Sequence, residues 1–343
     1  MDPLSQGLLG ASLSMSASKR ARFAVAGVLG LLSGLAPDLD VLIRSPSDPL
    51  LFLEFHRQFT HSLLFIPIGS LICACLFYPL IAKRHGFSFK QTWFYCFLGY
   101  ATHGLLDACT SYGTQLLWPL SNERFAWNSV SVIDPLFTIP LLAILTLAAW
   151  KRHPAIARIG FLWAITYLTI GMIQRERAEH TGWQIAKERQ HRPVQLEAKP
   201  SFGNILVWKV IYEDGGDFYI DAVRAGQDIK VYLGTKVAKL DIESSFPWLD
   251  ASSQQARDIQ RFNWFSDGFV ALSSNDELRI IDVRYSIVPN ELNALWSIEL
   301  APAATADQHV TYHTHRSSQA EDRQRFYDML LGREGFLGSL NEK

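Results

Sequence analysis

Apolar residues are concentrated in the first half of the chain, in long runs separated by short polar or basic stretches. The clearest run, Ser62–Ala82, is uncharged over 21 residues and is followed by Lys83, Arg84 and His85. Because about 20 apolar residues are needed to cross the hydrocarbon core of a bilayer, this run predicts a transmembrane helix. Shorter apolar runs are Phe23–Ala36, Gln91–Leu106, Pro135–Trp150 and Ile159–Ile173.

An isolated run of about 16 residues is equally compatible with a buried helix of a soluble protein. Several such runs in one half of the chain favour a membrane bundle of about five helices. The stretch Leu4–Ala17 is either a partner helix or a re-entrant segment. Gly30 and Gly34 form a GxxxG pair, which lets a second helix approach closely.

Basic residues cluster in three of the connections between these runs, and such clusters mark the cytoplasmic side of a membrane. Alternating the spans places all three clusters on one face: Lys19, Arg20 and Arg22; Lys83, Arg84 and Lys90; Lys151, Arg152 and Arg158. The opposite face then receives 37–60, 108–134 and everything after Ile173. We therefore expect a multi-pass membrane protein whose C-terminal domain lies on the side opposite the cytoplasm.

The pattern changes beyond residue 200, where short β-rich runs replace the long apolar ones. Two runs flank Asp214–Gly215–Gly216–Asp217, which is a hairpin signal. Residues 228–234, 268–274, 277–287 and 295–300 read as further strands. We expect a membrane domain over 1–173, a polar helical linker over 174–199, and a small antiparallel β-rich soluble domain over 200–343 with a polar tail that contains a helix near 320–331.

Composition narrows the function classes. The formal net charge is −1 over 343 residues, which gives no basis for binding nucleic acid. The four cysteines all lie in the apolar half and lack CxxC spacing, so they read as small buried hydrophobic residues. HExxH, GxSxG and P-loop motifs are absent from the sequence.

Two segments at the non-basic face carry candidate metal ligands. Asp38 and Asp40 follow Pro37 in "APDLD", where they either turn toward one cation or mark a solvated helix end. In "HRQFTHS", His56 and His61 would lie about 140° apart on one helix. They converge more easily if His56 lies in a loop and Thr60 caps the following helix. The alternative is a pair of interfacial histidines, with Arg57 extending toward lipid headgroups.

The strongest local signal is "HGLLD", in which His103 and Asp107 lie four residues apart on one helix face. Together they could chelate one ion, or Asp107 could orient an imidazole ligand. An ionisable pair inside a membrane is costly and marks a functional site, although a structural hydrogen bond is the alternative. Asp134 before Pro135 is explained by helix capping, and its participation in a site stays open.

The predicted topology brings these segments to one membrane face. Mixed imidazole and carboxylate donors suit one or two divalent ions, with zinc favoured and manganese or magnesium as alternatives. Such a site activates water and polarises a phosphoryl or carbonyl oxygen. Asp38 or Asp107 could act as the base, and Arg57 could hold an anionic substrate group.

Five blocks resemble, in order, the YdjM-type family of bacterial inner-membrane proteins, usually described as membrane-bound metal-dependent hydrolases: "MDPLSQGLLG", "GLAPDLDVL", "HRQFTHS", "HGLLDACTSYGTQLLWPLS" and "VSVIDPLFTIPLL". The resemblance covers roughly residues 1–173. It implies metal-site positions at Asp38, Asp40, His56, His61, His103 and Asp107. Gln6 stands where many relatives carry histidine, which implies one nitrogen donor fewer or a glutamine oxygen ligand. The HxxxD helix also resembles, distantly, all-helical zinc enzymes that cleave phosphoesters.

Two hypotheses follow for function. The first is a membrane-bound metal-dependent hydrolase that acts on a phosphoester or lipid-like substrate at the outer face of the inner membrane. The second is a metal-stabilised membrane scaffold without enzymatic activity, whose β-domain binds a protein partner.

Overall fold

The computed structural model describes residues 1–315 and 319–333 and divides into two compact units. The N-terminal unit comprises Met1–Ile43, Phe55–Met172 and Phe202–Asn204. The C-terminal unit comprises Arg44–Glu54, Ile173–Ser201 and the chain from Ile205 on. The short segment Arg44–Glu54 therefore belongs to the C-terminal unit although it interrupts the N-terminal one in sequence.

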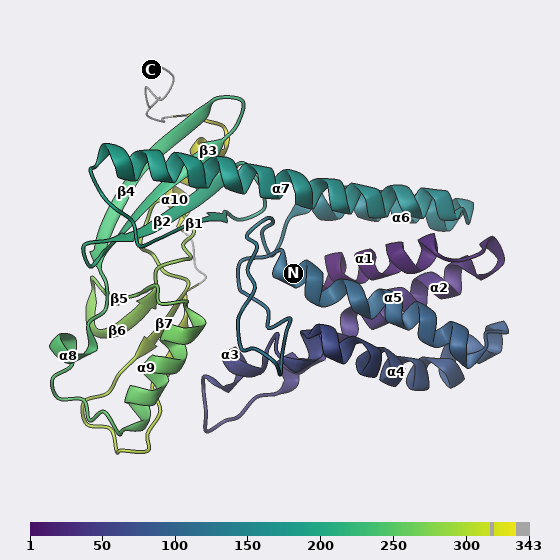
Figure 1. The fold of residues 1–343 in the computed structure, drawn as a ribbon, viewed down its shortest axis with the longest axis horizontal. Helices are drawn as coiled ribbons and strands as arrows, with labels where there is room; N and C mark the ends of the chain where they lie inside the picture. The colour runs from purple at the N-terminus through teal and green to yellow at the C-terminus, as the bar shows by residue number, and fades with distance from the viewer. Residues whose placement is uncertain (316–318, 334–343) are drawn as a thin grey trace. The chain divides into compact units, whose positions relative to one another are not determined.

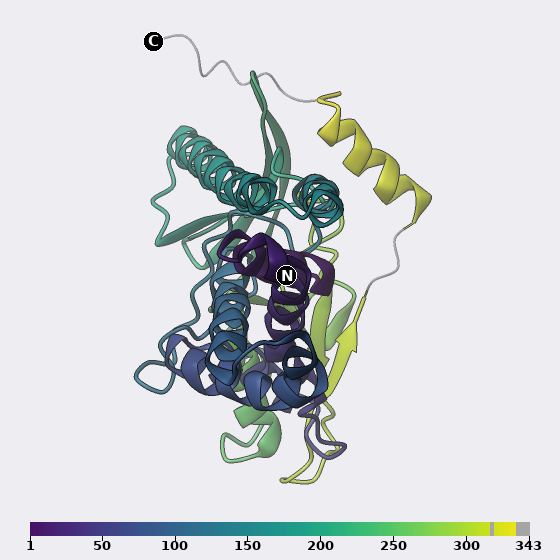
Figure 2. The ribbon, with the colours of Figure 1, turned by 90° about the vertical axis from the view of Figure 1, so that its right-hand side faces the viewer.

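The N-terminal unit is helical, and each apolar run of the sequence forms a helix (Figures 1 and 2). The sequence left open whether Leu4–Ala17 is a partner helix or a re-entrant segment. It forms a partner helix, α1, which packs along α2. The long helices of this unit are α1 (Pro3–Ser16), α2 (Phe23–Leu35), α4 (Ile66–Phe77), α5 (Phe89–Ala108), α6 (Pro135–Lys151) and the first half of α7 (Pro154–Glu188).

Small residues allow α1, α2 and α5 to pack in close contact. A Cβ atom on Gly30 of α2 would collide with the carbonyl oxygen of Gly10 in α1. On α5, a Cβ atom on Gly99 would collide with the backbone of Gly30. The predicted role of the Gly30–Gly34 pair in close helix packing is therefore confirmed.

The length and apolar composition of its helices mark this unit as a membrane domain. Three helical stretches in the described residues are long and apolar enough to cross a membrane: Arg20–Leu42, Leu63–His85 and Pro154–Glu188. Helix α6 is apolar but has only 17 residues, and α5 carries His103 and Asp107 within its 20 residues. The predicted helical membrane domain is confirmed, but the number of qualifying spans is smaller than the five that we expected.

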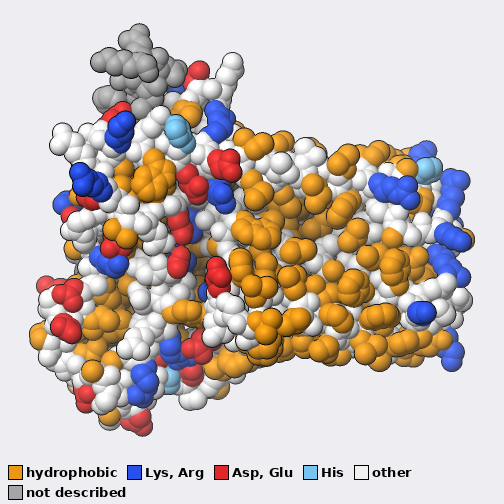
Figure 3. All heavy atoms as spheres, in the orientation of Figure 1, with side chains coloured by type: hydrophobic (Ala, Val, Ile, Leu, Met, Phe, Trp, Pro, Cys, Tyr) orange, Lys and Arg blue, Asp and Glu red, His pale blue; other side chains and the backbone are white. Residues whose placement is uncertain are grey.

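Hydrophobic side chains cover the outside of these helices, and Lys and Arg side chains gather at one end of the unit (Figure 3). This end holds the connections between α1 and α2, α4 and α5, and α6 and α7. The three basic clusters thus lie on one face, as the charge pattern predicts.

The C-terminal unit contains two four-stranded antiparallel sheets (Figure 1). The first sheet pairs β1 to β4 in chain order, and the second pairs β5 to β8 in the same way. The predicted hairpin is present, because Asp214 pairs with Asp217 across the Gly215–Gly216 turn. The strands are β1 (Gln195–Pro200), β2 (Val207–Asp214), β3 (Asp217–Ala225), β4 (Ile229–Ala238), β5 (Val270–Ser273), β6 (Asp276–Asp282), β7 (Trp296–Glu299) and β8 (Thr311–Thr314).

Several elements of this unit differ from the expectation. The linker region is helical only to Glu188, where α7 ends, and its last residues form β1. The sequence also gave no expectation of β8 or of α9 (Gln254–Phe265). Helix α9 is amphipathic and buries Ile259, Phe262 and Phe265, and β8 has only four residues, so neither contains a long apolar run. Short helices are α3 (Leu51–Phe55) and α8 (Ile242–Ser245), and the expected C-terminal helix is α10 (Ala320–Leu330).

Lys209 of β2 is a charged residue in the interior of the C-terminal unit. Its side chain is buried, and its ammonium group donates to Ser286 Oγ at 2.8 Å and to the carbonyl oxygen of Glu291 at 2.9 Å. Burial lowers the pKa of Lys209 to about 7, and the charges of Asp282 and Glu291 offset only part of this.

We predict that the C-terminal unit gains stability as pH rises from about 7 toward the ordinary lysine pKa near 10.4. Over this interval the unfolded chain binds the proton that the folded chain has lost, so raising pH favours folding. Denaturant unfolding of the full-length protein between pH 7 and 10 should show this trend. It should be weaker in Lys209→Met, and an equal pH dependence in both proteins would contradict the assignment.

Candidate metal centre

The sequence-predicted site residues all belong to the N-terminal unit and come from three segments. Asp38 and Asp40 lie in the 3-10 turn Ala36–Leu42 that continues α2. His56 and Arg57 follow α3, and His61 ends the 3-10 turn Phe59–His61. His103 and Asp107 lie in the last turns of α5.

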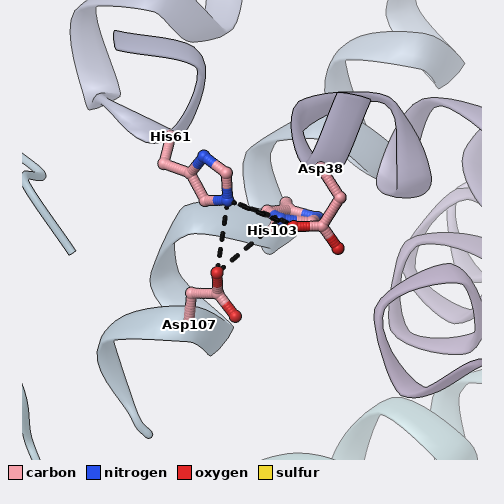
Figure 4. Close-up of side chains that lie close together, drawn as sticks. All are labelled: Asp38, His61, His103 and Asp107. Carbon is pink, nitrogen blue, oxygen red and sulfur yellow. Dashed lines mark hydrogen bonds and ion pairs between the residues drawn. The ribbon is translucent and has the colours of Figure 1, made fainter. Parts of the chain in front are cut away.

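Four of these side chains point at one position (Figure 4): Asp38, His61, His103 and Asp107. The Nε2 atoms of His61 and His103 lie 2.9 Å apart. Oδ1 of Asp38 lies 3.5 Å from the first nitrogen and 3.2 Å from the second, and Oδ2 of Asp107 lies 3.2 and 3.8 Å from them. Donors that surround zinc tetrahedrally are roughly 3.3 Å apart, given bonds of about 2.0–2.1 Å. The cluster could therefore hold one metal ion.

The outer nitrogen (Nδ1) of each imidazole is held by a hydrogen bond. The inner nitrogen (Nε2), which faces the centre of the cluster, is then left to offer its lone pair. Nδ1 of His103 donates to the carbonyl oxygen of Gly34 at 2.6 Å. Nδ1 of His61 lies 2.9 Å from Thr60 Oγ1, and that hydroxyl donates to Oδ2 of Asp40. In its neutral form each ring is then the tautomer whose lone pair lies on Nε2, the arrangement that partners of metal-binding histidines enforce. Two lone pairs 2.9 Å apart repel unless a cation lies between them.

The pKa of His61 also indicates that this cluster favours a bound cation. Burial alone would lower the pKa of this imidazole, but the surrounding carboxylates of Asp107, Asp38 and Asp40 raise it to about 10. A proton is thus the cation that this cluster retains when no metal is bound. Because a metal ion must displace that proton, metal affinity should fall as the pH falls.

Asp40 lies behind His61 and orders the segment that carries it. Its carboxylate accepts from His56 Nδ1 at 2.8 Å, from the backbone N–H of Arg57 at 3.0 Å and from Thr60. Asp38, Asp40 and His56 also form a second group whose donor atoms are close enough for an ion. The side chain of His56 is 31 % exposed, whereas those of His61 and Asp40 are inaccessible to solvent.

Local backbone geometry explains how these segments meet. A Cβ atom on Gly104 of α5 would collide with the backbone carbonyl oxygen of His61, so glycine permits the close approach. The predicted cap at Thr60 is wrong. Ser62 caps the turn that precedes α4 by accepting from the N–H of Phe65, which frees Thr60 to bind Asp40.

Asp107 brings further groups to the cluster. Gln6 of α1 donates from Nε2 to Oδ1 of Asp107 at 2.8 Å, and the amino group of Met1 contacts the same oxygen. Arg57 lies with Nε 3.1 Å from Oδ2, near enough for an ion pair but not aligned for a hydrogen bond. Oδ2 of Asp107 and Oε1 of Gln6 are both buried without a hydrogen-bond partner. Unsatisfied buried oxygens beside two free imidazole nitrogens fit a bound cation.

Other residues near the site were outside the reach of sequence reasoning. Thr110 accepts from Nη1 of Arg57 at 2.9 Å, and the ring of Tyr112 lies 5.1 Å from the guanidinium carbon. Both lie shortly after Asp107 in "HGLLDACTSYG". Their closeness to Asp107 in sequence was the signal that could have placed them near the site. Asp134 is an N-cap of α6 that accepts from Leu136 and Phe137, and it belongs to neither metal-ligand group.

Apolar helices that enclose a buried His/Asp cluster define an integral membrane protein with a candidate metal centre. Comparison with known proteins gives the family: residues 1–178 match the YdjM inner membrane protein family. Because the match covers just over half of the 343 residues, the chain belongs to this family. The resemblance noted in the sequence is confirmed.

Two relatives extend the comparison. The chain is 21 % identical over 258 residues to the uncharacterized protein YfhP of Bacillus subtilis, covering 74 % of this chain and 76 % of the relative. It is 29 % identical over 144 residues to the inner membrane protein YbcI of Escherichia coli, covering 39 % of this chain and 80 % of the relative. No solved structure gives a significant match.

We predict that His103→Ala abolishes stoichiometric metal binding, because it removes one of two facing imidazoles. Elemental analysis of the detergent-purified protein, after incubation with zinc or manganese and dialysis, measures this directly. His153→Ala is the matched control, since His153 is exposed in the connection between α6 and α7. Equal metal content in wild type and His103→Ala would show that the cluster holds only a proton.

Proposed function

We propose that this protein is a membrane-bound metal-dependent hydrolase that acts on a phosphoester or similar amphiphile at the outer face of the inner membrane. The observation that carries the proposal is the convergence of His61, His103, Asp38 and Asp107, with the Nε2 atoms of the two imidazoles 2.9 Å apart and facing each other. Two imidazoles and two carboxylates favour zinc, with manganese or magnesium as alternatives. Asp40 and His56 are the candidate ligands for a second ion.

When bound, the ion would supply a Lewis acid that polarises the scissile phosphoryl group and acidifies water. Asp38 is the most accessible carboxylate of the cluster, with a side chain 22 % exposed, against 0 % for Asp107. In this proposal Asp38 accepts a proton from the attacking water, whose oxygen bonds to phosphorus as the phosphorus–oxygen bond to the leaving group breaks. The proton then passes to the leaving-group oxygen. The Nε–H of Arg57 lies at the same cluster without an aligned partner, so it can donate to a phosphoryl oxygen.

The orientation of the proposed enzyme follows from its charges. The three basic clusters lie at one end of the helical unit and would be cytoplasmic. His103 and Asp107 lie near the C-terminal end of α5, which begins beside Lys90 of the basic end. The centre would therefore open toward the periplasmic face, and the C-terminal domain would be periplasmic.

A second candidate function is a metal-stabilised scaffold whose β-domain binds a partner. It is favoured by the number of protein donors, because four protein ligands in a tetrahedral arrangement are typical of closed structural sites. Catalysis requires that one position be open to water. The partly exposed Asp38 is the ligand that could yield this position.

We predict that the zinc- or manganese-loaded protein hydrolyses bis(p-nitrophenyl) phosphate or a short-chain phospholipid in detergent micelles. Asp38→Asn should lower the rate by about 10²-fold or more, the contribution typical of a general base. Metal content measured on the same samples separates the roles of Asp38, since loss of rate with retained metal identifies the base. A metal-loaded wild type no faster than His103→Ala on either substrate would favour the scaffold.

We predict that alkaline phosphatase is active when fused after Leu331 and inactive when fused after Lys83. This reporter folds only where its disulfides can form, which distinguishes the periplasm from the cytoplasm. The reverse pattern would place the metal centre and the C-terminal domain on the cytoplasmic side.

A further inference from the structure

The segment Arg44–Glu54 joins the two ligand-bearing stretches of the N-terminal unit, yet it folds as part of the C-terminal unit. In sequence it begins four residues after Asp40 and ends two residues before His56. Whatever fixes this segment also fixes the chain that leads into the metal centre. The anchoring of Arg44–Glu54 is therefore of direct interest.

Apolar contacts hold the middle of the segment. Leu50 and Leu53 are buried, with exposed fractions of 0 % and 5 %, in the core formed by α9 and the second sheet. The ring of Phe52 packs edge to face on Tyr312 of β8, with centroids 5.2 Å apart. Burying the two leucines stabilises the folded C-terminal unit as burial of other core side chains does. The segment is therefore an integral part of this unit.

Ion pairs on both sides of these apolar residues, at Asp48 and Glu54, hold the segment to one residue, Arg261 of α9. The guanidinium donates to both carboxylate oxygens of Asp48, at 3.0 and 2.9 Å, and to Glu54 at 2.5 Å. It also donates to Asp258 at 2.9 Å, a buried carboxylate that accepts from His309 and from the N–H of Val310. A bidentate, partly buried arginine with a fixed third partner is a stronger anchor than an exposed ion pair.

The chain continues from this anchor to the metal centre through hydrogen-bonded turns. Glu54 lies in α3, whose last residue is Phe55. The N–H of Gln58 donates to the carbonyl oxygen of Phe55, and the N–H of His61 donates to that of Gln58. Between them, Arg57 has a positive φ of 67° and donates its N–H to Asp40. Hydrogen-bonded turns therefore connect Glu54 to Arg57 and His61 along this stretch.

We propose that Arg261 is a positioning residue for the metal centre, and that the C-terminal unit controls the centre through the anchored segment Arg44–Glu54. A state of the C-terminal unit that releases Arg261 from Glu54 shifts residues 55–61 and weakens the His61–His103 arrangement. The metal readout of this inference rests on the proposed metal centre, whereas the mechanical coupling is independent of it.

The test compares Arg261→Gln with Arg257→Gln in the full-length protein in detergent. Arg257 is the matched control, because it lies one turn away on α9 and bonds to Gln254 and Ser252, which are close to it in sequence. Amide hydrogen exchange is measured over 44–54 and over 55–61, and zinc affinity is measured by competition with a chelator. Arg261→Gln should speed exchange in both stretches and weaken zinc binding about tenfold, as loss of an orienting group does.

Additional variants separate coupling from general destabilisation. Arg261→Lys should restore part of the protection, and the charge exchange Arg261→Glu with Glu54→Arg should restore more than either single change. Wild-type exchange rates over 55–61 in Arg261→Gln would overturn the inference, whether or not 44–54 loosens. If wild type binds no zinc, the proposed metal function fails, and the exchange rates still decide the coupling.

Discussion

The structure depends on the apposition of two imidazole nitrogens, His61 Nε2 and His103 Nε2, inside a helical membrane unit. Their outer nitrogens are committed to Gly34, Thr60 and, through the threonine hydroxyl, Asp40. The two inner lone pairs therefore face each other, and only a cation relieves their repulsion. Two carboxylates beside them supply the compensating negative charge, so the cluster is built for a positive ion in a medium where uncompensated charge is costly.

Such a cluster can form only if the backbones that carry it come unusually close. Gly30 and Gly99 bring α2 and α5 together, which places the 3-10 turn with Asp38 beside the end of α5. Gly104 lets the backbone of His61 lie against the same helix. In lipid, close packing of small residues replaces the hydrophobic driving force that associates helices in water. The same close helix packing that holds the membrane unit together therefore sets the geometry of the site.

The interruption of the N-terminal unit by Arg44–Glu54 adds a second constraint. The side chains of an ordinary surface loop are exposed to solvent, but Leu50 and Leu53 of this segment lie in the core of the C-terminal unit. The chain therefore passes between the two units on both sides of Arg44–Glu54, next in sequence to the ligand-bearing segments, as well as within α7. In the proposed coupling, Arg44–Glu54 is the route by which the C-terminal unit acts on the helical unit, for either candidate function.

The sequence by itself determined the membrane helices, the β-rich C-terminal part and the segments that carry the ligands. Long apolar runs, basic clusters and the HxxxD spacing are local signals, and a local signal survives in any tertiary arrangement. Tertiary structure alone decided that Asp40 orients His61, that Gln6 reaches Asp107, and that Arg44–Glu54 packs with α9. These are pairings between residues distant in sequence or between short elements, and they arise from packing that no single segment encodes.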